Sequence, residues 1–164
     1  MNKFKLEIKW ALFFTIMSLV WMLLERLLGL HDVHIEKHAI YTNFIAIPSI
    51  LIYVFALLDK RKNYYNGTLT YKQGFICGLI ITFIVTLLVP LSQYITSTII
   101  TPNYFSNAIN YAVENELMSK DDAMNFFNLK NYIIQGLIGA PIMGILTTAI
   151  VAIFTRKKLE SDVN

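Results

Sequence analysis

The chain has 164 residues, a formal net charge of +3, and a composition that is 55% hydrophobic and 15% charged. Soluble domains carry about 25% charged residues, so this composition excludes an ordinary soluble domain, while the length fits a single domain. The small net charge gives no reason to expect a nucleic-acid partner, and the single cysteine, Cys77, excludes an intramolecular disulfide.

Four apolar runs reach or approach the length of about 20 residues that a helix needs to cross a bilayer core. We predict membrane-spanning helices at about residues 8–30, 39–58, 75–100 and 132–154. Only helices and closed barrels satisfy their backbone polar groups in lipid, and these runs lack the alternation of apolar and polar residues that barrel strands show. The predicted fold class is therefore an all-α membrane protein with one integral membrane domain over residues 1–164.

Each predicted span carries one carboxylate or amide at a similar depth, namely Glu25, Asn43, Gln93 and Gln135. Polar side chains inside a membrane are costly and usually face the interior of a helix bundle, so we expect these four to cluster around Glu25. The cluster either binds a headgroup, a proton or a small solute, or only joins helices through hydrogen bonds worth about 0.6 kcal/mol each. We favour the second interpretation.

Three histidines, His31, His34 and His38, lie between the first two predicted spans. His34 and His38 are four residues apart, a spacing that places two zinc ligands on one face of a helix. However, about eight connecting residues are too few for a secure helix, and neither a nearby cysteine nor a second histidine cluster is present to complete a metal site. We therefore expect no metal and no cofactor, and predict a surface loop whose charge varies with pH.

Small residues recur every four positions in the third and fourth predicted spans. The glycines and alanine of these stripes are Gly74, Gly78, Gly136, Ala140 and Gly144. Such a pattern lets two helix backbones approach closely. We expect it to pack spans three and four against each other within one chain, because neighbouring spans usually pair. The alternative is an interface of a homo-oligomer.

The long connection at residues 101–131 is predicted to be a helical hairpin. Thr101 can cap a helix that begins at Pro102, and Ser119–Asp122 resembles a capping box for a second helix, which we expect to continue into the fourth span. The segment is acidic and rich in aromatic residues. Because interface cores are enriched in aromatic residues, we predict that residues 101–131 form the recognition element.

The basic residues are distributed unequally among the connections. Ten of the fourteen lie near the two termini and between the second and third predicted spans. Lys and Arg in short loops mark the cytoplasmic side, so we expect both termini in the cytoplasm and residues 101–131 outside it. Basic residues on that side also suit anionic lipid headgroups, which makes membrane lipids expected partners.

The chain from Gly67 onward resembles a known family. The resemblance rests on "GTLTYKQGF", the third apolar run, "ITPNYF", the acidic stretch "SKDDAMNFF", and "GLIGAPIMGILTTAIVAIFTRKK", in this order. This order is similar to that of the small four-span bacterial membrane proteins of domain-of-unknown-function family 4199. The resemblance implies a location in the bacterial inner membrane, and it carries over no catalytic residue, cofactor or substrate.

The sequence favours a non-enzymatic role. It contains no phosphate-binding glycine loop, no CxxC and no HExxH motif. We predict an accessory or scaffold subunit that docks an envelope or membrane partner through residues 101–131. The alternative is a small oligomeric transporter or channel that uses the cluster around Glu25, since Pro48, Pro90 and Pro141 interrupt three spans and broken helices line transporter sites.

Overall fold

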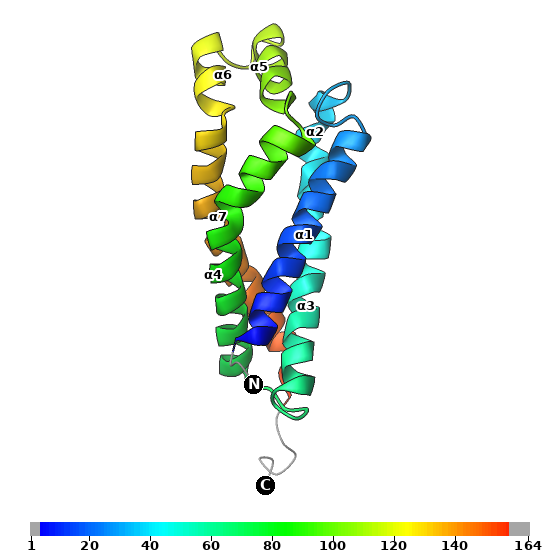
Figure 1. Cartoon of the computed structure of the whole chain (residues 1–164), viewed down its shortest axis with the longest axis vertical. Coiled ribbons are helices and arrows are strands. Elements are labelled where there is room, and N and C mark those ends of the chain that lie inside the picture. Colours follow the sequence, from blue (N-terminus) through cyan, green and yellow to red (C-terminus); the bar gives the residue numbers. More distant parts are fainter. Residues whose placement is uncertain (1–3, 158–164) are drawn as a thin grey trace. The chain divides into compact units, whose positions relative to one another are not determined.

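The structure is a computed structural model that describes residues 4–157. Within this part of the chain the elements are helices, and the only strand-like feature is an isolated bridge between Leu69 and Lys157. The helices in chain order (Figure 1) are α1 (Lys5–Leu27), α2 (Ile35–Tyr41), the 3₁₀-helix η1 (Thr42–Ile45), α3 (Ala46–Asn63), α4 (Tyr71–Ile95), the π-helix η2 (Thr96–Ile100), α5 (Tyr104–Glu114), α6 (Lys120–Phe126) and α7 (Leu129–Thr155).

Four helical stretches are long and apolar enough to cross a membrane, which confirms the predicted all-α membrane fold. They cover Lys5–Leu27, Ile35–Asn63, Tyr71–Ile100 and Leu129–Thr155. No more than 28% of the most apolar 18-residue window of any of them is buried. Their remaining apolar side chains therefore need lipid around them, because burial within the protein does not shield them from water.

The first span ends and the second begins earlier than predicted. Gly29 has a φ of +73°, which favours glycine. Around it, the Leu30 amide donates to the Glu25 carbonyl and the Gly29 amide donates to the Arg26 carbonyl, as in a Schellman motif. The helical path then resumes at Ile35, so His38 lies on α2 and not in the expected loop.

Residue contacts group the chain into two compact units, each of which takes pieces of several helices. The described residues of the first unit are 4–14, 47–87 and 139–157, and those of the second are 15–46 and 88–138. Each unit is described by itself below.

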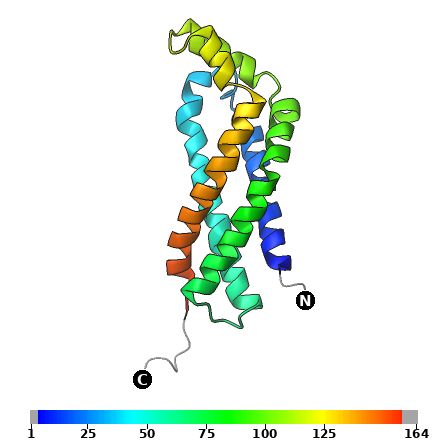
Figure 2. The same ribbon diagram turned by 90° about the vertical axis from the view of Figure 1, so that its left-hand side faces the viewer.

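In the first unit, α4 and α7 approach closely at small residues, and segments of the two helices lie adjacent in both views (Figures 1 and 2). A Cβ built on Gly78 would lie 2.3 Å from Thr148 Cγ2, and one built on Gly144 would lie 2.4 Å from Thr82 Cγ2. Gly74 packs in the same way against Ala152, at an ordinary van der Waals distance of 3.4 Å. The two stripes of small residues thus meet within one chain.

In the second unit, α5 and α6 pack against each other. They follow η2 and precede α7 along the chain. The predicted cap at Thr101 is wrong, since α5 begins at Tyr104 after Asn103, whose side chain makes no capping hydrogen bond. The predicted cap at Ser119 is confirmed, because its hydroxyl accepts from the Asp122 amide at 3.2 Å.

The expectation that the second of these helices continues into the fourth span is also wrong. Helix α6 ends at Phe126 and α7 begins at Leu129. The side chain of Asn128 explains the new start, since its Oδ1 accepts from the Asn131 amide at 2.9 Å and so caps α7.

Candidate functional site

A buried carboxylate in the last turn of α1 organises the candidate site, which lies within the second unit. The Glu25 side chain is 2% exposed. Its Oε1 accepts a hydrogen bond from Trp21 Nε1, and its Oε2 lies 3.1 Å from His31 Nε2 and 3.4 Å from His38 Nε2. A buried carboxylate requires such partners, because the transfer of an unpaired charge from water to the protein interior costs on the order of several kcal/mol.

Local sequence explains how two of these partners reach Glu25. Trp21 precedes Glu25 by four residues and so lies on the same face of α1. The turn at Gly29 then reverses the chain directly after the helix, which brings the His31 ring back over the carboxylate. Asn107 of α5 holds this turn in place, because its Nδ2 donates to the His31 carbonyl at 2.9 Å.

The third partner of Glu25 is His38 of α2. His34, which the sequence spacing pairs with His38, does not contact Glu25. His38 points toward Glu25, whereas the side chain of His34 is 51% exposed and lies 4.0 Å from Glu36. His34 precedes the first residue of α2 and forms no side-chain cap. The histidines that meet are therefore His31 and His38, with ring centroids 5.2 Å apart.

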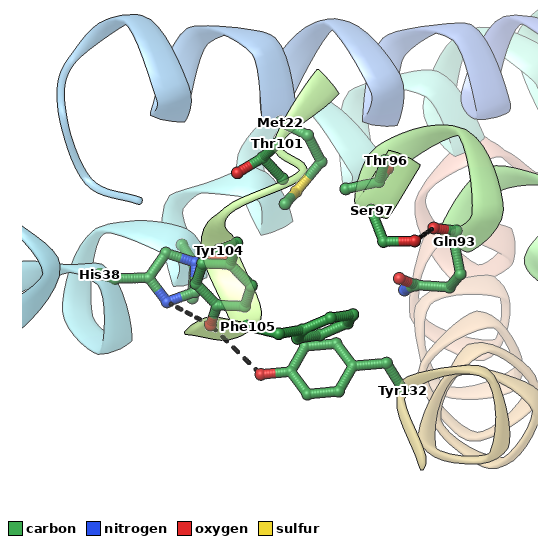
Figure 3. Close-up of a pocket in the computed structure, with 10 residues that line it drawn as sticks. Met22, His38, Gln93, Thr96, Ser97, Thr101, Tyr104, Phe105 and Tyr132 are labelled. Carbon is green, nitrogen blue, oxygen red and sulfur yellow. Dashed lines mark hydrogen bonds between the residues drawn. The ribbon is translucent and has the colours of Figure 1, made fainter. Parts of the chain in front are cut away.

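Tyr104 of α5 covers the two histidines. Its ring centroid is 5.1 Å from each histidine ring. Its hydroxyl lies 3.3 Å from His38 Nδ1 and 3.2 Å from the Tyr132 hydroxyl, and both contacts are drawn in Figure 3. Burial raises the pKa of the Tyr104 hydroxyl, so the group stays neutral and can accept one hydrogen bond while it donates another.

A cavity of about 200 Å³ adjoins this aromatic cover (Figure 3). Eight of its ten lining side chains carry a polar group, and they come from several helices and the connection after η2. The lining residues are Met22, His38, Thr42, Gln93, Thr96, Ser97, Thr101, Tyr104, Phe105 and Tyr132. One water molecule takes about 30 Å³ in the liquid, so the cavity has room for several waters or a small polar solute.

The structure places the four residues of the expected polar cluster in different surroundings. Gln93 lines the cavity beside His38. Asn43 is exposed and donates to the Ala39 carbonyl of its own helical stretch at 2.7 Å, and Gln135 is exposed. Glu25 thus takes its partners from Trp21 and the histidines instead of the expected amides.

Arg26, the residue that follows Glu25, connects the last turn of α1 to the end of η2. Its guanidinium donates to the carbonyl of Ile100, the last residue of η2. Carbonyls at the end of a helix lack partners within that helix, so a cation there satisfies one of them and meets the negative end of the helix dipole.

Comparison with known proteins identifies the family of the chain. The profile of a family described as protein of unknown function, DUF4199, matches residues 9–157. The chain belongs to the DUF4199 family. This confirms the resemblance that its carboxyl-terminal motifs carry. No curated protein and no solved structure matches the chain.

In this DUF4199 protein the candidate site has one plain chemical capacity. One carboxylate oxygen of Glu25, one ring nitrogen of His31 and one ring nitrogen of His38 lie within 4.8 Å of one another, a separation that one metal ion can bridge. The whole cluster lies inside the range that the family profile matches. The sequence did not predict this cluster, because helical spacing pairs His34 with His38 and the depth of Glu25 groups it with the amides of the other spans. A sequence signal for the cluster is the spacing of four residues from Trp21 to Glu25 and from Glu25 to Gly29. This spacing places Trp21 and Glu25 on one face of the helix, and the turn at Gly29 follows on the same face.

Proposed function

We propose that this multi-pass membrane protein is a non-enzymatic accessory subunit that docks a partner protein through residues 101–131. The proposal includes a bacterial inner-membrane location with both termini in the cytoplasm, for which the distribution of basic residues is the support. We call residues 114–126 the acidic tip. The observation that supports docking is the set of large apolar side chains that the acidic tip exposes.

The acidic tip exposes large apolar side chains outside the helices that are long enough to cross a membrane. The exposed fractions are 64% for Leu117, 53% for Met124, 41% for Phe126 and 37% for Met118. Exposed apolar groups that lie among polar residues mark interaction sites. Met and aromatic residues are also enriched in the cores of protein interfaces.

The charge of the acidic tip selects among its conceivable partners. Four carboxylates surround the apolar side chains, while Lys120 is the one basic residue of the tip; the carboxylates are Glu114, Glu116, Asp121 and Asp122. Like charges repel an anionic lipid surface and a second copy of the tip. The partner that fits is therefore a protein with an apolar patch bordered by Lys or Arg.

The test is site-specific photocrosslinking in cells. A photoreactive residue at Leu117 should give one discrete adduct with another protein, and the adduct should disappear when the four carboxylates become Asn or Gln. A matched control replaces two exposed polar residues of the same tip, Asn115→Ser and Asn125→Ser, and should keep the adduct. An adduct of twice the chain's mass, or one that survives neutralisation of the carboxylates, contradicts the proposal.

A second candidate function rests on the cavity beside His38 and Gln93. Polar side chains that line a cavity between membrane-spanning helices suit a small transporter or channel. A complementation experiment in cells that lack the chromosomal copy distinguishes the transport function from the docking function. Gln93→Phe fills the cavity and should abolish complementation by a transporter, whereas it should leave docking through Leu117 intact.

A further inference from the structure

We propose that Glu25, His31 and His38 bind a divalent transition-metal ion, with Zn²⁺ as the best-fitting ion. This site lies apart from the acidic tip and does not depend on the docking function. The carboxylate and the two imidazoles supply one ligand atom each, and these atoms all lie within 4.8 Å of one another.

The distances between the ligand atoms fit tetrahedral coordination. Zinc binds imidazole nitrogen at about 2.0–2.1 Å and carboxylate oxygen at about 2.0–2.2 Å, so a tetrahedral angle places two ligand atoms about 3.3–3.5 Å apart. Glu25 Oε2 lies 3.1 Å from His31 Nε2 and 3.4 Å from His38 Nε2. These two separations lie within a few tenths of an ångström of the tetrahedral value, and the two imidazole nitrogens, which lie within 4.8 Å of each other, would close around the ion.

An unsatisfied nitrogen is the second observation. His38 Nε2 is buried and makes no hydrogen bond among residues 4–157, because its contact with Glu25 Oε2 at 3.4 Å has the distance of an ion pair and does not meet the geometry of a hydrogen bond. Buried polar atoms normally have a partner, and each exception calls for an explanation such as an ion. A metal bound between His38 and Glu25 would use this lone pair.

The surrounding hydrogen bonds prepare two of the three ligands, His38 and Glu25, for a metal. When His38 Nδ1–H donates to the Tyr104 oxygen and Tyr104 donates to Tyr132, the lone pair of His38 is on Nε2, toward Glu25. Metal-binding histidines almost always donate their other ring nitrogen in this way. Trp21 occupies Glu25 Oε1, which leaves Oε2 for the ion.

The set of ligands indicates the class of metal. Two imidazoles and one carboxylate suit Zn²⁺, Fe²⁺, Co²⁺, Ni²⁺ or Cu²⁺, whereas Mg²⁺ and Ca²⁺ prefer oxygen ligands. Three protein ligands leave a fourth tetrahedral position for water or a solute.

The test uses the full chain in detergent, purified without an oligohistidine tag and stripped with a chelator. Zn²⁺ or Co²⁺ is then added, unbound metal is removed, and the metal that remains is measured by mass spectrometry. We expect one equivalent in the unaltered protein and in His34→Ala, which removes the exposed histidine and is the matched control. Glu25→Gln, His31→Gln and His38→Gln should lose the ion, and Tyr104→Phe should weaken its binding by about tenfold.

A measurement on the unaltered protein keeps the proposal testable when a ligand variant does not fold. Electron spin-echo spectra of the Cu²⁺-loaded protein count the imidazoles on the metal, and we expect two. A folded protein that retains no metal overturns the proposal and leaves a buried carboxylate–histidine ion pair. Binding that His34→Ala abolishes, or a spectrum without two imidazoles, overturns it as well.

Discussion

Lys60 Nζ lies 2.8 Å from Glu7 Oε1, and the two side chains are 5% and 2% exposed. The Lys60 ammonium also lies 3.6 Å from the centroid of the Tyr64 ring. This pair joins α1 to α3 within the first unit. Lys60 follows the second predicted span and is one of the basic residues between the second and third predicted spans, yet its side chain is buried against a carboxylate.

Lys60→Met should destabilise the protein by about 3–5 kcal/mol, because it leaves the Glu7 carboxylate buried without its charge partner. Unfolding in detergent, followed by circular dichroism, measures the change. The double variant Glu7→Gln, Lys60→Met should be less destabilised than the single one. Lys9→Ala is the control, since the side chain of Lys9 in its pair with Asp59 is 50% exposed, and it should cost about 1 kcal/mol or less.

Gly78→Ala should destabilise the first unit by about 1–3 kcal/mol, because the new methyl group overlaps Thr148. Thr148→Ala should recover part of this loss by removing the two nearest atoms. Gly139 lies on the same helix as Thr148, and a Cβ there meets nothing within 4 Å among the described residues. Gly139→Ala should therefore be neutral or stabilising, and an equal loss from both substitutions would contradict the close packing of α4 and α7.

The hydroxyls of Tyr104 and Tyr132 should prove energetically coupled, since they form one hydrogen-bond chain with His38. A double-mutant cycle with Tyr104→Phe and Tyr132→Phe should give a coupling free energy of about 0.5–1.5 kcal/mol. The same cycle with Tyr104→Phe and Tyr53→Phe is the control, because the Tyr53 hydroxyl pairs with Thr82 in the other unit. Additive effects in the first cycle would show that the chain of hydroxyls does not form.

Gly29→Ala should destabilise the protein and weaken metal binding more than Gly67→Ala does. Both glycines have positive φ angles, of +73° and +95°, so each substitution carries a similar backbone cost of about 1 kcal/mol. Only at Gly29 does a Cβ also clash, at 2.7 Å from Val33 Cγ2, whereas none of the described atoms lies within 4 Å at Gly67. Thermal unfolding and zinc retention provide the two measurements, and equal effects at both sites would contradict a special role for the turn.

The orientation in the membrane can be tested with single cysteines, because Cys77 is the only native one. In a Cys77→Ala background, Glu116→Cys should react with a membrane-impermeant maleimide in intact cells. Lys62→Cys should react only after the membrane is opened. Both positions are exposed, so burial would not explain a difference. The reverse pattern would overturn the assignment of the termini to the cytoplasm and of the acidic tip to the outside.

The sequence by itself determined the features that depend on nearby residues. Hydropathy predicted four spans because crossing lipid requires about 20 consecutive apolar residues, and the structure has four helices that meet this criterion. The cap at Ser119 was likewise predictable, since a serine side chain bonds an amide only three residues away. The family match also follows from the order of motifs along the chain.

Only the tertiary structure decided which side chains meet Glu25. His31 reaches it through a turn that depends on one positive φ at Gly29, and His38 reaches it because α2 begins earlier than hydropathy alone indicates. Tyr104 arrives from a helix 66 residues beyond the histidine that its hydroxyl contacts. Such contacts depend on where separate helices end and how they pack, and periodicity within one helix carries no information about either.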